Sequence, residues 1–113
     1  MRWSWMLALL LWGCSQGSDK DLPSIVAARS LGAEWALVNE QSLDGHLSAT
    51  YVDAMHKELR QQLQSSRNSL TRPKSDYGRE IDLLLQHPDN ASPQALRVHV
   101  AKLKQIENKL ESA

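Results

Sequence analysis

The sequence predicts a small all-α domain, a bundle of about four amphipathic helices arranged as two helical hairpins. From Leu22 onward, apolar residues recur at three- and four-residue steps in four successive segments, which is helical spacing. The residues between these segments are of the kinds that begin and end helices. No segment shows the alternation of apolar and polar residues that is typical of a strand. The region 22–113 is long enough for one such domain and too short for two.

The first helix is predicted from Leu22 to about Ser42. Pro23 suits its first turn, where the N–H that proline lacks would have no partner in the helix. Four residues form its main apolar face: Ala28, Leu31, Trp35 and Val38. The segment 43–46 contains Asp-Gly and is expected to be a turn.

Ser48 is expected to cap the second helix, with Leu47 and Val52 packed together as a hydrophobic staple. Its apolar face is predicted to contain Val52, Met55, Leu59, Leu63 and Leu70. Because the connection is short, the first two helices should form an antiparallel hairpin. The segment 71–75 contains Pro73, which is expected to break this helix.

A shorter third helix is predicted from about Asp76 to Gln86. Its inward face is predicted to consist of Tyr77, Ile81, Leu84 and Leu85. The segment 87–90 ends this helix, and Ser92 followed by Pro93 then provides an N-cap and a first-turn proline. The apolar face of the last helix is predicted to consist of Leu96, Val100, Leu103, Ile106 and Leu110.

The N-terminal segment has the features of an export signal. Arg2 gives a cationic start, residues 3–12 are apolar except for Ser4, and the small residue Gly13 precedes Cys14. An apolar run of about ten residues is too short for a membrane-spanning helix, which needs about twenty. It lies within the range of roughly seven to fifteen that is usual for the core of a signal peptide. Cleavage is therefore predicted between Gly13 and Cys14.

The run Leu11-Trp12-Gly13-Cys14 resembles the lipobox of bacterial lipoprotein precursors, with Trp12 at a position where a small residue is usual. The resemblance covers about the first fifteen residues. It implies that residues 1–13 are a lipoprotein signal peptide, and that the thiol of Cys14 is alkylated with diacylglycerol. It also implies that the freed amine receives an acyl chain such as palmitate, so that several chains anchor the protein. The alternative interpretation is that Cys14 is a chance free thiol.

Ser15 follows Cys14 where lipoproteins retained in the inner membrane often carry Asp. The resemblance therefore implies a periplasm-facing location at the outer membrane. Residues 14–21 are polar, contain Gly and Ser and lack apolar periodicity, so they are predicted to form a flexible tether that reaches roughly 15 Å. The helical domain is predicted over 22–113. Since the chain has one cysteine, it cannot form an internal disulfide.

The composition argues against several classes of function. Acidic and basic residues balance at 13 each, so no strong electrostatic field favours nucleic acid. The string from Gly13 to Gly17 fits the pattern G-x-S-x-G, but that motif needs a strand before its serine. Here it crosses the predicted cleavage site and no strand precedes Ser15, so no nucleophile is predicted. No catalytic residue, cofactor or small-molecule substrate is predicted.

No metal site is predicted from the four histidines, because none pairs with another at metal-ligand spacing on a helix. His46 and His87 are expected in turns. His56 and His99 are expected at the borders of apolar helix faces. His99 is a candidate for a pH-dependent contact, since imidazole titrates near neutrality.

Two groups of charged residues are predicted to be solvated, one acidic and one basic. Glu80 and Asp82 are two residues apart, so they lie on different sides of a helix rather than next to each other. The last helix is mildly basic through Arg97, Lys102, Lys104 and Lys109. A solvated face is expected there, with lipid phosphate groups as the alternative ligand.

The predicted function is non-enzymatic binding of an envelope protein or component by a helical domain that Cys14 anchors to the lipid bilayer. Ile25, Leu37 and Val98 lie off the main apolar faces, so they could leave apolar surface for a partner helix, unless the core-facing stripes are simply wider. One alternative is a small lysis or exclusion lipoprotein that acts on the membrane. The other is an enzyme whose residues carry no local signature.

Overall fold

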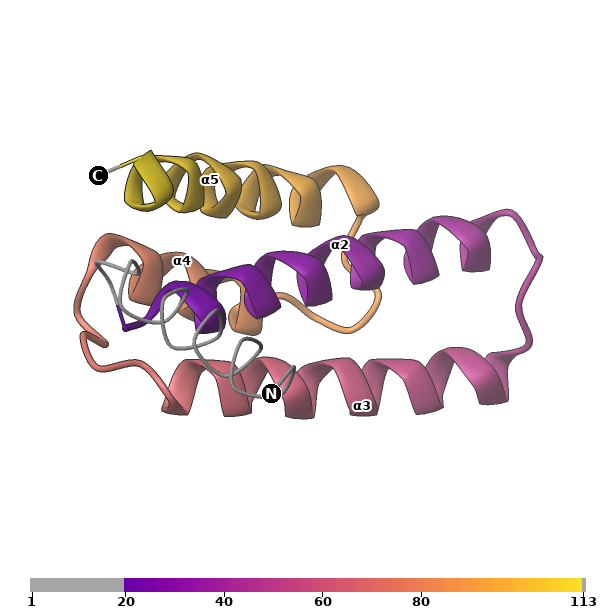
Figure 1. Cartoon of the computed structure of the whole chain (residues 1–113). Coiled ribbons are helices and arrows are strands. Elements are labelled where there is room, and N and C mark those ends of the chain that lie inside the picture. Colours follow the sequence, from indigo (N-terminus) through magenta and orange to yellow (C-terminus); the bar gives the residue numbers. More distant parts are fainter. Residues whose placement is uncertain (1–19, 113) are drawn as a thin grey trace, which may run out of the picture.

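The computed structural model describes residues 20–112, which form an all-α bundle without strands (Figure 1). Its helices are α2 (Leu22–Leu43), α3 (Ala49–Asn68), α4 (Asp76–Gln86) and α5 (Pro93–Ser112). The predicted fold class is therefore confirmed. The predicted signal peptide, the lipidation site Cys14 and most of the predicted tether lie outside the described residues.

Helix α2 lies between α5 and α3, and the shorter α4 packs against α3 and α5 (Figure 1). Successive helices run in opposite directions, so α2 and α4 begin at the same end of the bundle at which α3 and α5 finish. We call this the N-terminal end of the bundle. The turn 44–48, which joins α2 to α3, marks the opposite end, which we call the hairpin end.

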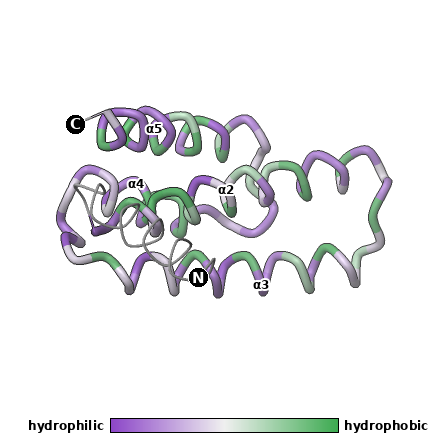
Figure 2. Tube along the Cα trace, viewed as in Figure 1, coloured by the Kyte–Doolittle hydropathy of each residue, from purple (hydrophilic) through white to green (hydrophobic). Residues whose placement is uncertain are grey.

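The core is largely aliphatic, and hydrophobic residues recur along all four helices (Figure 2). Its largest fully buried apolar side chains come from every helix: Ile25, Trp35, Leu63, Ile81, Leu84, Leu96 and Leu103. Because α2 packs on both α3 and α5, it buries a broader surface than one narrow stripe. Of the two alternatives for Ile25, the wider core-facing stripe is therefore the one that the structure shows, since its side chain is fully buried. Leu37 and Val98 are exposed, so for these two residues the alternative of apolar surface outside the core holds.

The helix starts follow the predicted capping residues. The side-chain oxygen of Ser48 accepts from the backbone N–H of Tyr51 at 3.2 Å, which confirms the cap of α3. Ser92 likewise accepts from Ala95 N at 3.2 Å and Pro93 begins α5. Leu47 packs against the core as expected for a staple residue.

The short connection from α3 to α4 can pack closely on α4 because Gly78 has no side chain. A Cβ atom built on this glycine would lie 2.2 Å from the carbonyl oxygen of Pro73, which is closer than real contacts allow. The backbone N–H of Gly78 also donates to the side-chain oxygen of Ser75, the cap of α4. The loop 71–75 is therefore packed tightly on the first turn of α4.

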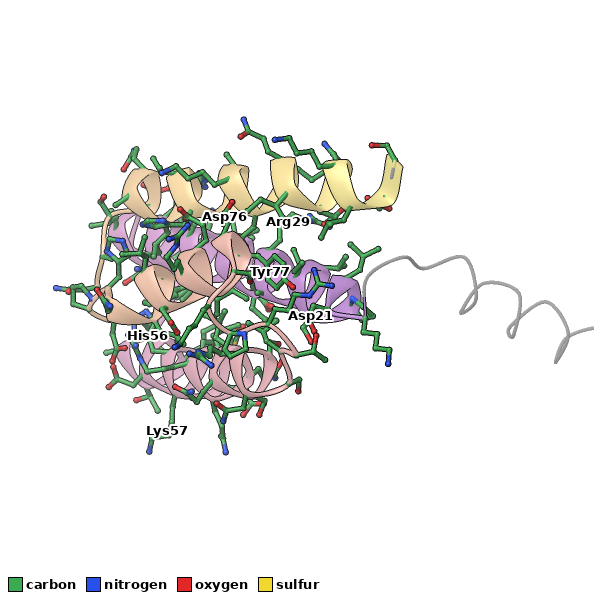
Figure 3. The ribbon with its side chains drawn as sticks, turned by 90° about the vertical axis from the view of Figure 1, so that its left-hand side faces the viewer. Asp21, Arg29, His56, Lys57, Asp76 and Tyr77 are labelled. Atoms are coloured by element: carbon green, nitrogen blue, oxygen red, sulfur yellow. The ribbon has the colours of Figure 1, made fainter. Side chains whose placement is uncertain are left out.

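Asp21 belongs to the folded domain, although the predicted tether ran as far as this residue. Its side chain is fully buried and accepts from Thr71 N at 2.7 Å, Arg72 N at 3.0 Å and the Tyr77 hydroxyl at 2.7 Å. Figure 3 shows Asp21 and Tyr77 next to each other, where the described chain begins. The carboxylate thus fastens the start of α2 to the loop 71–75 and to α4.

Opposite charges link α2 to α5 at the side of the bundle. Arg29 Nε lies 2.6 Å from Glu107 Oε1, and Lys104 Nζ lies 2.9 Å from Glu107 Oε2. The hydrogen bond from Lys104 lowers the pKa of Glu107, burial opposes it, and Arg29 lowers it further, so that the pKa stays below its ordinary value. The buried carboxylate of Glu107 is therefore kept ionised by its two cationic partners.

Candidate functional site

A groove of about 840 Å³, lined by residues with polar side chains, runs along the outer face of α3. Its lining includes Asp53, Lys57, Arg60, Gln61, Gln64 and Asp89. A smaller hollow of about 290 Å³ shares Asp53, His56 and Asp89 with it and continues to Leu43 at the end of α2. We call the two together the α3 groove. In Figure 3, His56 points into the bundle and Lys57 points away from it into solvent.

Buried Asn39 on α2 organises the wall of the α3 groove. Its side-chain N–H group donates to the carbonyl oxygens of Asp89 at 2.9 Å and Ala91 at 2.7 Å. These carbonyls fix the amide orientation, so its oxygen faces His56 Nε2 at 2.6 Å. Because an amide oxygen only accepts, His56 Nε2 carries the donated proton. Asn39 therefore joins α2, α3 and the loop 87–92 at one buried point.

Arg60 on α3 fastens the same loop from the outside. Its guanidinium group donates to the carbonyl oxygens of Leu85 at 2.7 Å and His87 at 2.8 Å. It also donates to Asp89 Oδ1 at 2.9 and 3.0 Å. The same group lies 4.9 Å from the ring centroid of Trp35, which is cation–π distance, and Trp35 Nε1 donates to Asp89 O at 2.9 Å. The loop 87–92, which forms this wall of the groove, is therefore held in place by Arg60 and Trp35.

Behind this loop, two histidines meet between α4 and α5. His99 Nδ1 lies 2.8 Å from Glu80 Oε2, and His99 Nε2 lies 3.0 Å from His87 Nε2. Lys102 Nζ lies 3.7 Å from the other oxygen of Glu80. Burial, and then the charge on His99, lower the pKa of His87 below its ordinary value. Only one proton fits between the two facing nitrogens, so this contact opposes charging both rings.

Comparisons with protein-family models, with curated proteins and with solved structures find no match to this chain.

The predicted site residues fall into different places. Gly13 and Cys14 lie outside the described residues. His46 is in the turn after α2, where its Nδ1 lies 2.8 Å from Gln41 Oε1, and His87 follows α4, as predicted for both. His99 lies against Glu80 and His87, and the pH dependence of this contact stays a prediction.

The prediction that Glu80 is solvated is wrong, because its side chain is 12% exposed and faces His99. Asp82 points to a different neighbour, as its helix position predicted, and lies 2.7 Å from Arg67 Nε on α3. The basic face of α5 is also less free than predicted. Three of its four cations are paired with acids: Arg97 with Glu40, Lys102 with Glu80 and Lys104 with Glu107.

Sequence reasoning did not find Asn39 or Arg60, because their partners lie far along the chain. Asn39 reaches across 52 residues to Ala91, and Arg60 across 29 to Asp89. One local signal was available: Asn39 follows Trp35 by four residues and so lies on the same buried helix face. A polar residue at such a position has to find partners inside the fold.

Two further observations on residues 20–112 concern metal binding and membrane crossing. Within this range, no three His, Cys, Asp or Glu side chains are grouped so that they could hold a metal ion. No helix in the same range combines the length and the apolar character that crossing a membrane requires.

Proposed function

We propose that this protein is a lipid-anchored bacterial lipoprotein that faces the periplasm and binds an envelope protein through the α3 groove, without catalysing a reaction. The observation that carries the proposal is the run from Leu11 to Cys14 behind a short apolar segment with a cationic start. Acylation of Cys14 would hold the domain at the membrane surface. Ser15 after the cysteine supports the outer membrane as the site of anchoring.

The position of the folded domain supports this proposal. Asp21 is already buried in the bundle, so only a short stretch separates it from Cys14. A chain from Cys14 to Asp21 spans at most about 25 Å when fully extended. An acylated Cys14 would therefore keep the whole bundle close to the lipid surface while leaving its sides accessible.

The α3 groove supports a binding role because its wall is held in place by hydrogen bonds and the residues along its open side carry polar side chains. Arg60 and Asp89 are engaged with each other and with the loop 87–92, so they form a preorganised wall. Gln61 and Gln64 on the outer face of α3 present amide groups that can donate and accept. Leu43, 78% exposed, adds an apolar contact at the far end of the groove. This combination suits an extended polar segment of a partner protein with one apolar side chain.

Metabolic labelling with a clickable fatty acid tests the anchor. Wild-type protein should incorporate the label and fractionate with the outer membrane, whereas Cys14→Ser should lose the label. Ser18→Ala is a matched control that changes a nearby residue without removing the thiol. Label retained in Cys14→Ser would show that the thiol is not the acyl acceptor.

Photocrosslinking in cells tests the groove. A photoreactive residue in place of Gln61 or Gln64 should give a discrete adduct with one envelope protein. The matched control is Gln94, an exposed glutamine on α5 that does not line the groove. The same adduct from all three positions, or none from Gln61 and Gln64, would argue against the groove as the binding surface.

A further inference from the structure

We propose that the N-terminal end of the bundle rests on the anionic headgroups of the membrane that holds Cys14, with Lys20, Arg72 and Lys74 as the contacting residues. This inference rests on the proposed lipid anchor, and it adds an orientation: one particular end of the bundle faces the bilayer. The occupant of this surface is the lipid bilayer itself.

The first argument is where the chain from the anchor enters the fold. Asp21 accepts hydrogen bonds from the backbone N–H groups of Thr71 and Arg72, so Lys20, the residue before it, lies close to the loop 71–75. The chain from Cys14 to Lys20 spans at most about 20 Å. The surface charge of a membrane is felt over about 8 Å at physiological ionic strength. A lipid-anchored Cys14 therefore allows Lys20 and the loop 71–75 to come within the range of the headgroup charge.

The second argument is the charge at this end. Lys20, Arg72 and Lys74 are exposed. The ion pairs within residues 20–112 use other cations, so these three carry charge that no acid of the described part neutralises. Of the acids at this end, Asp21 is buried and accepts from backbone N–H groups, and Asp76 pairs with Arg79. Lys109 and Glu111, both exposed at the end of α5, offset each other.

The third argument is the contrast with the hairpin end. Asp44 in the turn after α2 and Asp53 in the first turns of α3 are exposed there. Since acidic and basic residues balance over the whole chain, the bundle carries an asymmetric distribution of charge rather than a net charge. An anionic surface attracts the N-terminal end and repels the hairpin end. This orientation turns Leu43 and its end of the α3 groove toward the periplasm, where a partner can reach them.

Amine footprinting of the acylated full-length protein tests the orientation. The protein is purified from membranes and reconstituted in vesicles of phosphatidylcholine, or of equal parts phosphatidylcholine and phosphatidylglycerol. Acylation of each lysine by a small amine-reactive reagent is then followed by mass spectrometry. On the anionic vesicles, Lys20 and Lys74 should react at least about fivefold more slowly. Attraction to such a surface favours the bound position of each nearby basic residue by about this factor. Lys57, about 17 Å along α3 from the end of that helix, should react at the same rate on both.

Charge reversal supplies the second arm. Arg72→Glu combined with Lys74→Glu should restore the reactivity of Lys20 on anionic vesicles. Lys57→Glu should leave the protection of Lys20 on these vesicles unchanged. High salt should also remove the protection. Equal reactivity of Lys20, Lys74 and Lys57 on both vesicles, with Cys14 shown to be acylated, would overturn the orientation and leave the anchor intact. An unmodified Cys14 in the same mass spectra would remove the anchor, and this inference with it.

Discussion

At the scale of single residues, Asp21 connects the predicted anchor to the fold. Burial alone would raise the pKa of this carboxyl group, but hydrogen bonds from Thr71, Tyr77 and Arg72 together lower the pKa below its ordinary value. Asp21 is therefore protonated at a higher pH in the unfolded chain than in the folded protein. The stability that Asp21 contributes is present above about pH 4 and is lost as the pH falls through its lower folded pKa.

Asp21→Asn should lower the free energy of unfolding by about 2 kcal/mol at neutral pH, since an amide group cannot accept all three hydrogen bonds and its N–H atoms would face donors. Urea unfolding at neutral pH and near pH 3 measures this effect, and the gap between wild type and variant should narrow in acid. Asp53→Asn, at an exposed position on α3, is the matched control and should have little effect. An equal loss in both variants would contradict the assignment.

His87 makes a second prediction at this scale. Its pKa is lowered by burial and by the charge on His99, so the unfolded state binds the proton more readily than the folded state. The stability linked to a neutral His87 is complete above about pH 6.5 and is lost as the pH falls through the lower folded pKa. Its ring faces His99 on α5, which in turn contacts Glu80 on α4, and its carbonyl oxygen accepts from Arg60 on α3.

Thermal unfolding of wild type and His87→Asn between about pH 8 and pH 5 checks this linkage. Wild type should lose stability across this range, and the variant should lose less, because the residue that resists protonation has been removed. His46→Asn, in the exposed turn, should retain the wild-type pH dependence. A pH dependence in His87→Asn as steep as that of wild type would be inconsistent with this role of His87.

At the scale of elements, the loop 87–92 depends on a helix that is distant in sequence. Asn39→Ala would leave the carbonyl oxygen of Ala91 and Nε2 of His56 without their buried partner. We expect it to lower the free energy of unfolding by about 2–4 kcal/mol, since an unsatisfied buried polar group keeps its full desolvation cost. Denaturant unfolding measures the loss, with Asn68→Ala at the exposed end of α3 as control. If both alanine variants were equally stable, the buried network would not be what holds the loop.

The helices themselves could be predicted because their signals are local. The prediction of Asp76 to Gln86 for the third helix agrees with α4, and Ser48 and Ser92 cap α3 and α5 as expected. What could not be predicted is which helix lies in the middle. Since α2 contacts both α3 and α5, its buried surface extends to Ile25, and no periodicity within one helix reveals a second neighbour.

The candidate site was less predictable than the fold for the same reason. Its hydrogen bonds join residues that are tens of positions apart, as in Asn39 with Asp89 and Arg60 with Asp89. His87 and His99 each have an ordinary position on the chain, and only the packing of α4 on α5 brings their rings together. Glu80 was predicted to be solvated because its helix position was known but the proximity of α5 was not.

At the scale of the whole molecule, the proposed arrangement is a compact bundle on a short tether, with its basic end toward the lipid and the α3 groove along its side. The proposed roles of the α3 groove, the loop 87–92 and the membrane contact all depend on the anchor at Cys14. If the bundle were not held at a membrane, Lys20, Arg72 and Lys74, which form no ion pair within residues 20–112, would be ordinary solvated residues.

Mass spectrometry of the mature protein's N-terminal peptide, isolated from the membranes of the producing cells, tests the central claim most directly. We predict a peptide that begins at Cys14 and carries the mass of a diacylglycerol group on its thiol and an acyl chain on its amine. A peptide that begins at Met1, or one with an unmodified Cys14, would contradict the account.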